Sequence, residues 1–271
     1  MKISMERAWD RAITLLKGNT DVLAILAGLF FFLPGFAGVF FLGQQPQIAQ
    51  GMTPEQMMPL LQAYLISIMP YILVVTVIGA IGRLAMLVLF TDRSRPTVQE
   101  ALKRGLIGVL PYILATAIVA VAMSLVAALL VIAPAKAGAM AIAGIGIGLT
   151  IVLAIYVSIK VSLIPAVIVA EHTLNPLTAI RRSWRLTSGN SLRLLLFYAL
   201  LLIPYVIIAA LAEGLFGMVG ALVGGPQGQL FVGGAASSLV GALWGALTAA
   251  ITAALYEQLS GSPRTAATTF E

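Results

Sequence analysis

Few residues of the kind that carry out acid–base or nucleophilic chemistry occur in this chain of 271 residues. Cysteine is absent and His172 is the one histidine, so neither thiol chemistry nor a cluster of imidazole ligands for a metal is available. Glu171 and His172 are adjacent, and neighbouring residues on a helix do not face one another. Ser158 and Lys160 are two residues apart, which disfavours a Ser–Lys dyad for the same reason. We therefore expect no catalytic residues, no metal and no cofactor.

Nucleotide and nucleic-acid binding are also disfavoured. The glycines at 144, 146 and 148 are spaced as in a dinucleotide fingerprint, but that motif needs a preceding strand and a turn into a helix. Here the glycines lie inside a long apolar run. The net charge of +6 is not gathered in a basic tail or arm, as a nucleic-acid-binding protein would require.

Three charged residues interrupt apolar runs, namely Arg83, Lys160 and Glu213. A charge at the centre of a bilayer costs roughly 2.5–3.5 kcal/mol on insertion scales. For Arg83 and Lys160 we weigh two interpretations: the long side chains reach back to the interface, or the two cations form a pocket for a phosphate or carboxylate. Glu213 lies near the outer end of its run, where water solvates it.

Composition places these residues in a membrane protein. Hydrophobic residues make up 60% of the chain and charged residues 10%, whereas a soluble protein carries roughly 25% charged residues. The mean hydropathy is +1.03. A membrane-spanning helix needs roughly 20 mostly apolar residues. We therefore predict an all-α, polytopic membrane protein with about six transmembrane helices, at residues 22–42, 64–90, 106–132, 139–170, 192–215 and 232–255.

The positions of the cations predict the orientation of the spans. Lys and Arg collect in cytoplasmic loops, and the loops on the other side of these spans hold only Lys136. Both termini should therefore be cytoplasmic, in the bacterial inner (cytoplasmic) membrane. The cations that predict this are Lys2, Arg7, Arg11 and Lys17, then Arg93, Arg95, Lys103 and Arg104, then Arg181, Arg182, Arg185 and Arg193, and finally Arg264.

Three connections carry helix start signals. Thr97 and Glu100 have capping-box spacing and open an amphipathic stretch that ends at Arg104. Asn175 and Pro176 form an N-cap and a first-turn proline for a helix over 176–187, which we expect to lie at the interface with Trp184 as an anchor. On the outer side, a short helix is predicted over 53–61.

The chain also contains a weak internal repeat. Residues 8–19 (AWDRAITLLKGN) and 179–190 (AIRRSWRLTSGN) both place Arg three residues after Ala and both end in Gly-Asn. Residues 101–105 (ALKRG) keep the Ala-to-Arg spacing. We predict a single membrane domain over 1–260, with candidate repeats 1–92, 93–172 and 173–260 that each contain an interfacial helix and two spans, followed by a short cytoplasmic tail over 261–271.

Small residues every fourth position predict close helix packing, because they let two backbones approach. The contact is expected within the chain, and a homodimer face is the alternative. The residues concerned are Gly144, Gly148, Gly233, Ser237, Gly241 and Gly245, continued by Ala249 and Ala253.

Residues 165–171 (PAVIVAE) and 175–193 (NPLTAIRRSWRLTSGNSLR) resemble the glycerophosphodiester phosphodiesterase membrane-domain family, as do residues 95–102 (RPTVQEAL). In some members of that family the membrane domain is fused to a soluble phosphodiesterase barrel that holds the active site. No such barrel occurs in these 271 residues, so the resemblance implies fold and location rather than catalysis.

These observations predict a non-catalytic integral membrane protein that binds anionic lipid headgroups or partner proteins and has a role in envelope organisation. The alternative is a transporter or lipid translocator that uses kinked spans and buried Arg83 and Lys160. Membrane lipids are the expected partners, with a protein partner or a second copy of the chain as alternatives, and no nucleic acid. The predicted headgroup site consists of Arg83, Lys160, Arg181, Arg182, Arg185 and Arg193.

Overall fold

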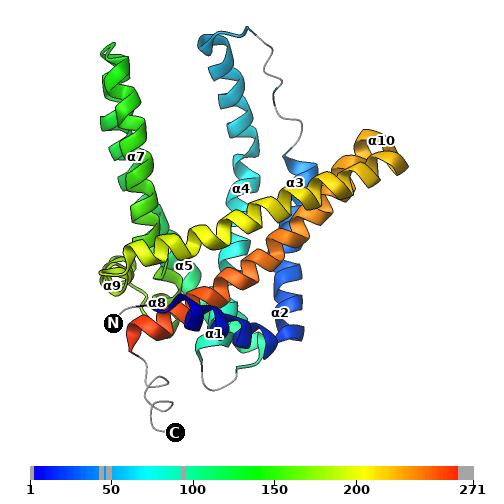
Figure 1. Cartoon of the computed structure of the whole chain (residues 1–271), viewed down its shortest axis with the longest axis vertical. Coiled ribbons are helices and arrows are strands. Elements are labelled where there is room, and N and C mark those ends of the chain that lie inside the picture. Colours follow the sequence, from blue (N-terminus) through cyan, green and yellow to red (C-terminus); the bar gives the residue numbers. More distant parts are fainter. Residues whose placement is uncertain (1–2, 43–45, 47–50, 93–95, 262–271) are drawn as a thin grey trace. The chain divides into compact units, whose positions relative to one another are not determined.

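The computed structural model describes residues 3–42, 46, 51–92 and 96–261, and over these residues the chain is helical without strands (Figure 1). The chain divides into two compact units. The first contains Met1–Gly18, Arg83–Leu201 and Thr248–Glu271, and the second contains Asn19–Gly82 and Leu202–Leu247. Each unit is described by itself below.

The helices follow one another with short connections. Figure 1 labels the α-helices among them other than α6. In chain order, they are α1 (Met5–Lys17), α2 (Thr20–Ala27), the π-helix η1 (Gly28–Phe32), α3 (Leu33–Phe41), α4 (Pro54–Thr91), α5 (Val98–Ala127), the π-helix η2 (Ala128–Ile132), α6 (Ala133–Lys136), α7 (Met140–Val161), α8 (Ile164–Ala170), α9 (Pro176–Thr187) and α10 (Ser191–Ser260).

Five helical segments are long and apolar enough to cross a membrane, namely Thr20–Phe41, Glu55–Thr91, Val98–Lys136, Met140–Ala170 and Ser191–Ser260. The first four coincide with the first four predicted spans or extend beyond them, with at most one predicted residue left out. The fifth contains both of the last two. The helix predicted over 53–61 is not a separate element, because its residues form the first turns of α4. The stretch from Thr97 to Arg104 is likewise the start of α5.

A sharp turn divides α10 within the second unit. Gly224 has φ −132° and ψ 17°, and Gly225 has φ 62° and ψ −150°. The Gly225 conformation is essentially restricted to glycine. Beyond the turn the two limbs run back along each other, and a side chain on Gly220 or Gly228 would collide with the backbone of the other. The two limbs correspond to the predicted runs at 192–215 and 232–255.

Prolines explain the irregular turns inside the helices. A proline lacks the N–H that bonds to the carbonyl four residues earlier, and its ring collides with that carbonyl. The π-helices η1 and η2 end two residues before Pro34 and Pro134 respectively, and a local π turn is one way to accommodate a proline in a membrane helix. Pro165 instead follows the break between α7 and α8. Pro70 and Pro204 lie inside α4 and α10.

The core of the first unit forms where the last turns of α4 and α10 meet α5, α8 and the start of α10. Large side chains here are almost fully buried, including Leu87, Leu163 and Leu255. The outer faces of η2 and α7 are different, since Leu129 is 72% exposed and Ile145 is 67% exposed. Exposed aliphatic side chains of this kind suit contact with lipid.

The predicted packing glycines behave differently in the two units. In the second unit a side chain on Gly233 would meet the Glu213 carbonyl and Gly217, and one on Gly245 would meet the Phe31 ring, so both allow close packing. Gly241 lies beside Tyr205, and Ser237 is half-buried.

In the first unit, Gly144 and Gly148 face open space. The close approach is made instead by Gly146, where an added side chain would collide with the Leu130 carbonyl. The spacing signal is therefore displaced by two residues, which on a helix is about half a turn.

Four of the predicted cytoplasmic cations, Lys2, Arg93, Arg95 and Arg264, lie outside the described residues, as does all of the predicted tail except Gly261.

Candidate functional site

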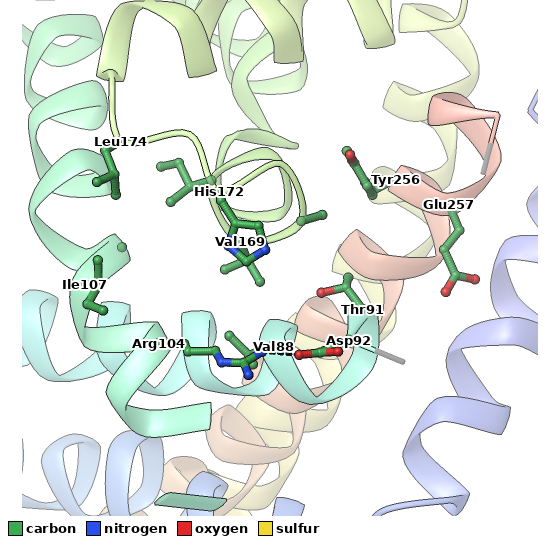
Figure 2. A pocket seen from close by; sticks show the side chains of 13 residues that line it. Val88, Thr91, Asp92, Arg104, Ile107, Val169, His172, Leu174, Tyr256 and Glu257 are labelled. Atoms are coloured by element: carbon green, nitrogen blue, oxygen red, sulfur yellow. Dashed lines mark hydrogen bonds and ion pairs between the residues drawn. The ribbon is translucent and has the colours of Figure 1, made fainter. Parts of the chain in front are cut away.

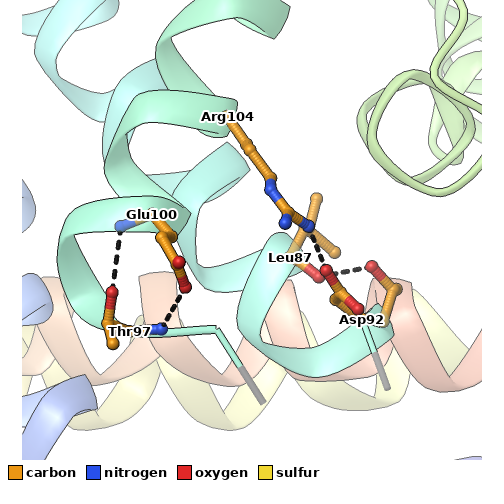
Figure 3. Close-up of polar contacts among 6 residues, drawn as sticks. Leu87, Asp92, Thr97, Glu100 and Arg104 are labelled. Atoms are coloured by element: carbon orange, nitrogen blue, oxygen red, sulfur yellow. Dashed lines mark hydrogen bonds and ion pairs between the residues drawn. The ribbon is translucent and has the colours of Figure 1, made fainter. Parts of the chain in front are cut away.

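The start of α5 positions the first polar side chain of the site (Figure 3). The Thr97 hydroxyl accepts a bond from the Glu100 backbone N–H at 3.3 Å, and the Glu100 carboxylate accepts one from the Thr97 N–H at 2.9 Å. This confirms the predicted capping box. One turn later, Gly105 lies so close to the Ala85 backbone that a side chain there would not fit. The close crossing of α4 and α5 brings Arg104 to Asp92, and the two form an ion pair.

The N-cap of α9 is also as predicted. The Asn175 side chain accepts bonds from the N–H groups of Leu177 and Thr178 at 2.9 and 3.3 Å, and Pro176 occupies the first helical position. Gly189, after the helix, has φ +82°, the left-handed conformation in which glycine commonly ends a helix. These signals fix α9 so that Arg182 lies beside Glu171, with 2.7 Å between Arg182 Nε and Glu171 Oε1.

A third ion pair joins the two ends of the described chain. Arg11 of α1 donates two bonds to Glu257 of α10, Nε to Oε2 at 2.8 Å and Nη2 to Oε1 at 3.1 Å. This is the paired, bidentate geometry that makes an arginine–carboxylate contact both strong and directional. Arg11 is 31% exposed and Glu257 17%, so this pair is better shielded from water than one at an open surface.

The three ion pairs follow one rule. Each arginine comes three residues after an alanine that is completely buried: Ala8, Ala101 or Ala179. Each carboxylate lies at the end of an apolar helix: Asp92 directly after α4, Glu171 directly after α8, and Glu257 in the last turn of α10. Arg104 and Arg182 each pair with the helix-end carboxylate that comes before them in the chain. Arg11 precedes all three of these carboxylates and pairs with the last one, Glu257. We call them the three arginine–carboxylate pairs.

Hydrogen bonds connect the same elements. The Ile3 N–H donates to Asn190 Oδ1 at 3.0 Å. Ser4 and Gln258 exchange two bonds, at 3.2 and 3.3 Å. The Tyr256 hydroxyl donates to Glu171 at 2.9 Å, so this carboxylate serves both Arg182 and Tyr256. The first unit thus has a polar layer that ties α1, α9 and the end of α10 together.

A cavity of about 740 Å3 lies within this polar layer (Figure 2). Its apolar walls come from α4, α5 and α8 and include Val88, Ile107 and Val169. Its polar lining includes members of two of the pairs (Asp92, Arg104 and Glu257) and Tyr256, which contacts the third. Ligand pockets typically measure roughly 300–1,000 Å3 and combine apolar walls with a few polar groups. The cavity has both properties.

His172 also lines the cavity, and its backbone is unusual. Its φ is +51°, the one positive value among the described residues other than glycine. The left-handed conformation costs an L-residue roughly 1–2 kcal/mol, although histidine adopts it more often than most residues. Figure 2 shows the His172 ring directed toward the side of the cavity where Arg104 lies.

Lys160 lies apart from this cavity lining, at the junction between α7 and α9. It is 3% exposed, and its ammonium group is 5.4 Å from the centre of the Tyr156 ring, 5.6 Å from that of the Trp184 ring and 3.3 Å from Ser188 Oγ. A cation over two aromatic faces is stabilised electrostatically. At the end of α7 the Lys160 carbonyl lies in the last turn, where carbonyls lack a partner within the helix. It accepts a hydrogen bond from the Ser183 hydroxyl at 2.7 Å.

Helix α9 has a buried face and an exposed face. Leu177 and Trp184 are 52% and 38% exposed, and Arg181 and Arg185 are exposed beside them. The buried face is formed by Ala179, Ser183, Leu186 and Thr187. The predicted anchor Trp184 thus lies on the exposed part of α9. The sequence did not predict the buried face, which packs against the protein.

The predicted headgroup residues are therefore not one cluster. Arg181, Arg182 and Arg185 all belong to α9. Lys160 contacts this helix through the Trp184 ring. Arg83 lies near the Tyr198 phenol of α10 instead, and the contacts among the described residues include none between Arg83 and Lys160. Arg193 is half-exposed in the first turn of α10.

Asp92, Glu257 and Tyr256 were not among the predicted site residues. The available signal was the position of an acid at the end of three apolar runs, at Asp92, Glu171 and Glu257. Taken with the Ala-to-Arg spacing of the repeat, it could have predicted the pairs.

The long apolar helices define the class of protein, since they have the length and composition of a multi-pass membrane protein. The chain belongs to a family described as a domain of unknown function (DUF7847), whose model matches residues 24–259. The match includes both members of two arginine–carboxylate pairs, together with Glu257, and begins after Arg11. No curated protein and no solved structure matches the chain.

Proposed function

We propose that the chain is a six-span membrane protein that binds anionic lipid headgroups at its cytoplasmic face, without catalysis, and so contributes to envelope organisation. The observation that carries the proposal is the exposed face of α9. Leu177 and Trp184 lie there beside Arg181 and Arg185. An apolar strip next to cations is the arrangement by which a helix lies in a membrane surface and meets lipid phosphates.

The turn at Gly224 and Gly225 supports six spans rather than five. A helix of 70 residues would be about 105 Å long at 1.5 Å per residue, several times the ~30 Å thickness of the hydrocarbon core. Division at the turn gives two limbs of suitable length. An even number of spans puts both termini on one side.

The polar layer supports a common side for the arginine-rich connections. The three arginine–carboxylate pairs and their hydrogen bonds join α1, the end of α4, the start of α5, α9 and the end of α10. Charged groups that contact one another must lie at the same depth. Because Lys and Arg collect on the cytoplasmic side, this layer is assigned to that side.

The same pairs support the three-repeat organisation. Each candidate repeat begins with an Ala-x-x-Arg segment and ends with a carboxylate, and each arginine pairs with the carboxylate of the repeat before it. The first repeat pairs with the third through Arg11 and Glu257, which closes the series. The first and third repeats agree further: Ala12 and Ser183 are both fully buried, and Asn19 and Asn190 precede the next helix in each.

Two further interpretations stay predictions. The likeness of residues 165–193 to the glycerophosphodiester phosphodiesterase membrane domain concerns α8, α9 and their connection, and the family match neither includes nor excludes it. Transport through kinked spans would use Arg83 and Lys160. The close packing of Lys160 against Tyr156 and Trp184 favours a positioning role for this cation at α9.

Native mass spectrometry tests the headgroup proposal. The full chain would be released from nanodiscs that contain equal amounts of phosphatidylglycerol and phosphatidylcholine, and the retained lipids counted. A basic residue near an anionic surface contributes about 1 kcal/mol, so the double variant Arg181→Gln, Arg185→Gln should retain phosphatidylglycerol at least about fivefold less well than the wild type.

Lys136→Gln is the matched control, because Lys136 is exposed in the connection assigned to the opposite side. It should leave the retained phosphatidylglycerol unchanged. Equal retention by the double variant and the control would refute binding at α9.

A further inference from the structure

We infer that the cavity beside the Arg104–Asp92 pair is a binding site for an amphipathic anion, with an acyl or alkyl chain against its apolar walls and a phosphate or carboxylate head at Arg104 and His172. This goes beyond headgroup contact at α9, because it concerns a cavity that other residues form. The inference rests on the proposed position of the polar layer at the membrane surface. It does not depend on lipid binding at α9, because no residue of α9 lines the cavity.

The apolar part of the lining is suited to a hydrocarbon chain. Val88, Ile107 and Ile168 come from three different helices and line the same space. Such walls favour a hydrocarbon chain, because its binding removes apolar surface from water.

The charges of the lining favour an anion. Glu257 already accepts two bonds from Arg11, and Asp92 is paired with Arg104, so both carboxylates are compensated. Arg104 is different. Its guanidinium has five N–H donors and its side chain is 46% exposed. Among the described residues it makes one hydrogen bond, from Nη1 to Asp92. The remaining donors can bind the oxygens of a phosphate or carboxylate.

The location of the cavity fits a ligand with one charged and one apolar end. Its polar residues belong to the layer where the helices leave their apolar stretches, as Thr91, Ala170 and Tyr256 each directly precede the carboxylate of a pair. The left-handed backbone of His172 directs its ring toward this charged end (Figure 2). A strained residue that lines a cavity is typical of a ligand site.

Binding of radiolabelled dodecyl phosphate to the full chain in phosphatidylcholine nanodiscs tests the inference. Scintillation proximity would report the bound probe, with empty nanodiscs subtracted. Arg104→Gln should weaken saturable binding at least about tenfold, because a hydrogen bond to a charged group is lost. Lys103→Gln removes the same charge from the neighbouring exposed position and should change the affinity less than about twofold.

Two more variants keep the test decisive if Arg104→Gln disturbs the fold. Asp92→Asn releases Arg104 from its ion pair and should keep or increase the affinity. Ala170→Leu fills the cavity from its wall and should weaken binding about tenfold. Inorganic phosphate at the same concentration should not compete, because it has no chain.

Three results would overturn the inference: equal binding by Arg104→Gln and Lys103→Gln, binding weakened by Asp92→Asn but strengthened by Arg104→Gln, or full competition by inorganic phosphate. Displacement of the probe by phosphatidylglycerol in the nanodisc would support the site and assign it to a leaflet lipid. Displacement by free dodecanoate alone would support it as a site for a single-chain amphiphile. Failure here with normal lipid retention at α9 would leave the proposed function standing.

Discussion

Two groups of arginines in the first unit have different surroundings, and the difference bears on what each group can do. Arg11, Arg104 and Arg182 follow buried alanines and are paired with carboxylates. Arg181 and Arg185 are exposed on α9 beside Trp184. A paired arginine holds two elements together, whereas an exposed one beside an apolar strip is available to lipid phosphates.

The Arg11–Glu257 pair should make a measurable contribution to stability, because it is bidentate and partly shielded. We expect Arg11→Gln and Glu257→Gln each to lower the free energy of unfolding by about 1 kcal/mol. The double variant should lose less than the sum of the two, with a coupling energy of about 1 kcal/mol. Chemical unfolding in mixed micelles measures all four proteins.

Arg7→Gln is the control for this cycle, because Arg7 is exposed on the same helix, and its unfolding free energy should stay within about 0.5 kcal/mol of the wild type. Additive effects of Arg11→Gln and Glu257→Gln would show that the two side chains do not act as a pair.

At the level of the elements, local signals predict the helices well and their packing less well. The caps at Thr97 and Asn175 are confirmed, because each depends on neighbouring residues alone. The continuity of α4 was not predicted, since the turns that follow Pro54 were expected to form a separate short helix. The pairing partners Asp92 and Glu257 were missed because they meet their arginines only after distant segments have packed.

The packing of α7 gives the sharpest test at this scale. Gly146 abuts the Leu130 carbonyl, and Gly148, two residues further on, faces open space. Gly146→Ala should therefore lower the free energy of unfolding by roughly 1–3 kcal/mol through overpacking. Gly148→Ala should be neutral or slightly stabilising, because alanine favours a helix more than glycine does.

Thermal unfolding in detergent, followed by circular dichroism, would compare these two variants. If Gly148→Ala were the more damaging substitution, the packing face of α7 would be the one marked by Gly144 and Gly148, as in a helix–helix contact with a second copy of the chain.

At the level of the whole molecule, composition alone predicts the class, because a chain with 60% hydrophobic and 10% charged residues has too few polar groups to cover its helices in water. The five long apolar segments agree with that prediction. The cavity could not be predicted from the sequence, because its lining comes from four separate segments whose meeting depends on the packing of the first unit.

Cysteine accessibility tests the proposed topology most directly, because the natural chain contains no cysteine and every single substitution reports one site. A membrane-impermeant maleimide would be applied to right-side-out membrane vesicles before and after permeabilisation. The six substitutions are Glu55→Cys, Lys136→Cys and Gln227→Cys on one side and Lys17→Cys, Lys103→Cys and Thr178→Cys on the other, all at exposed positions. We predict labelling of the first three in intact vesicles and of the last three only after permeabilisation; labelling of Lys103→Cys and Thr178→Cys in intact vesicles would contradict the cytoplasmic placement of the polar layer.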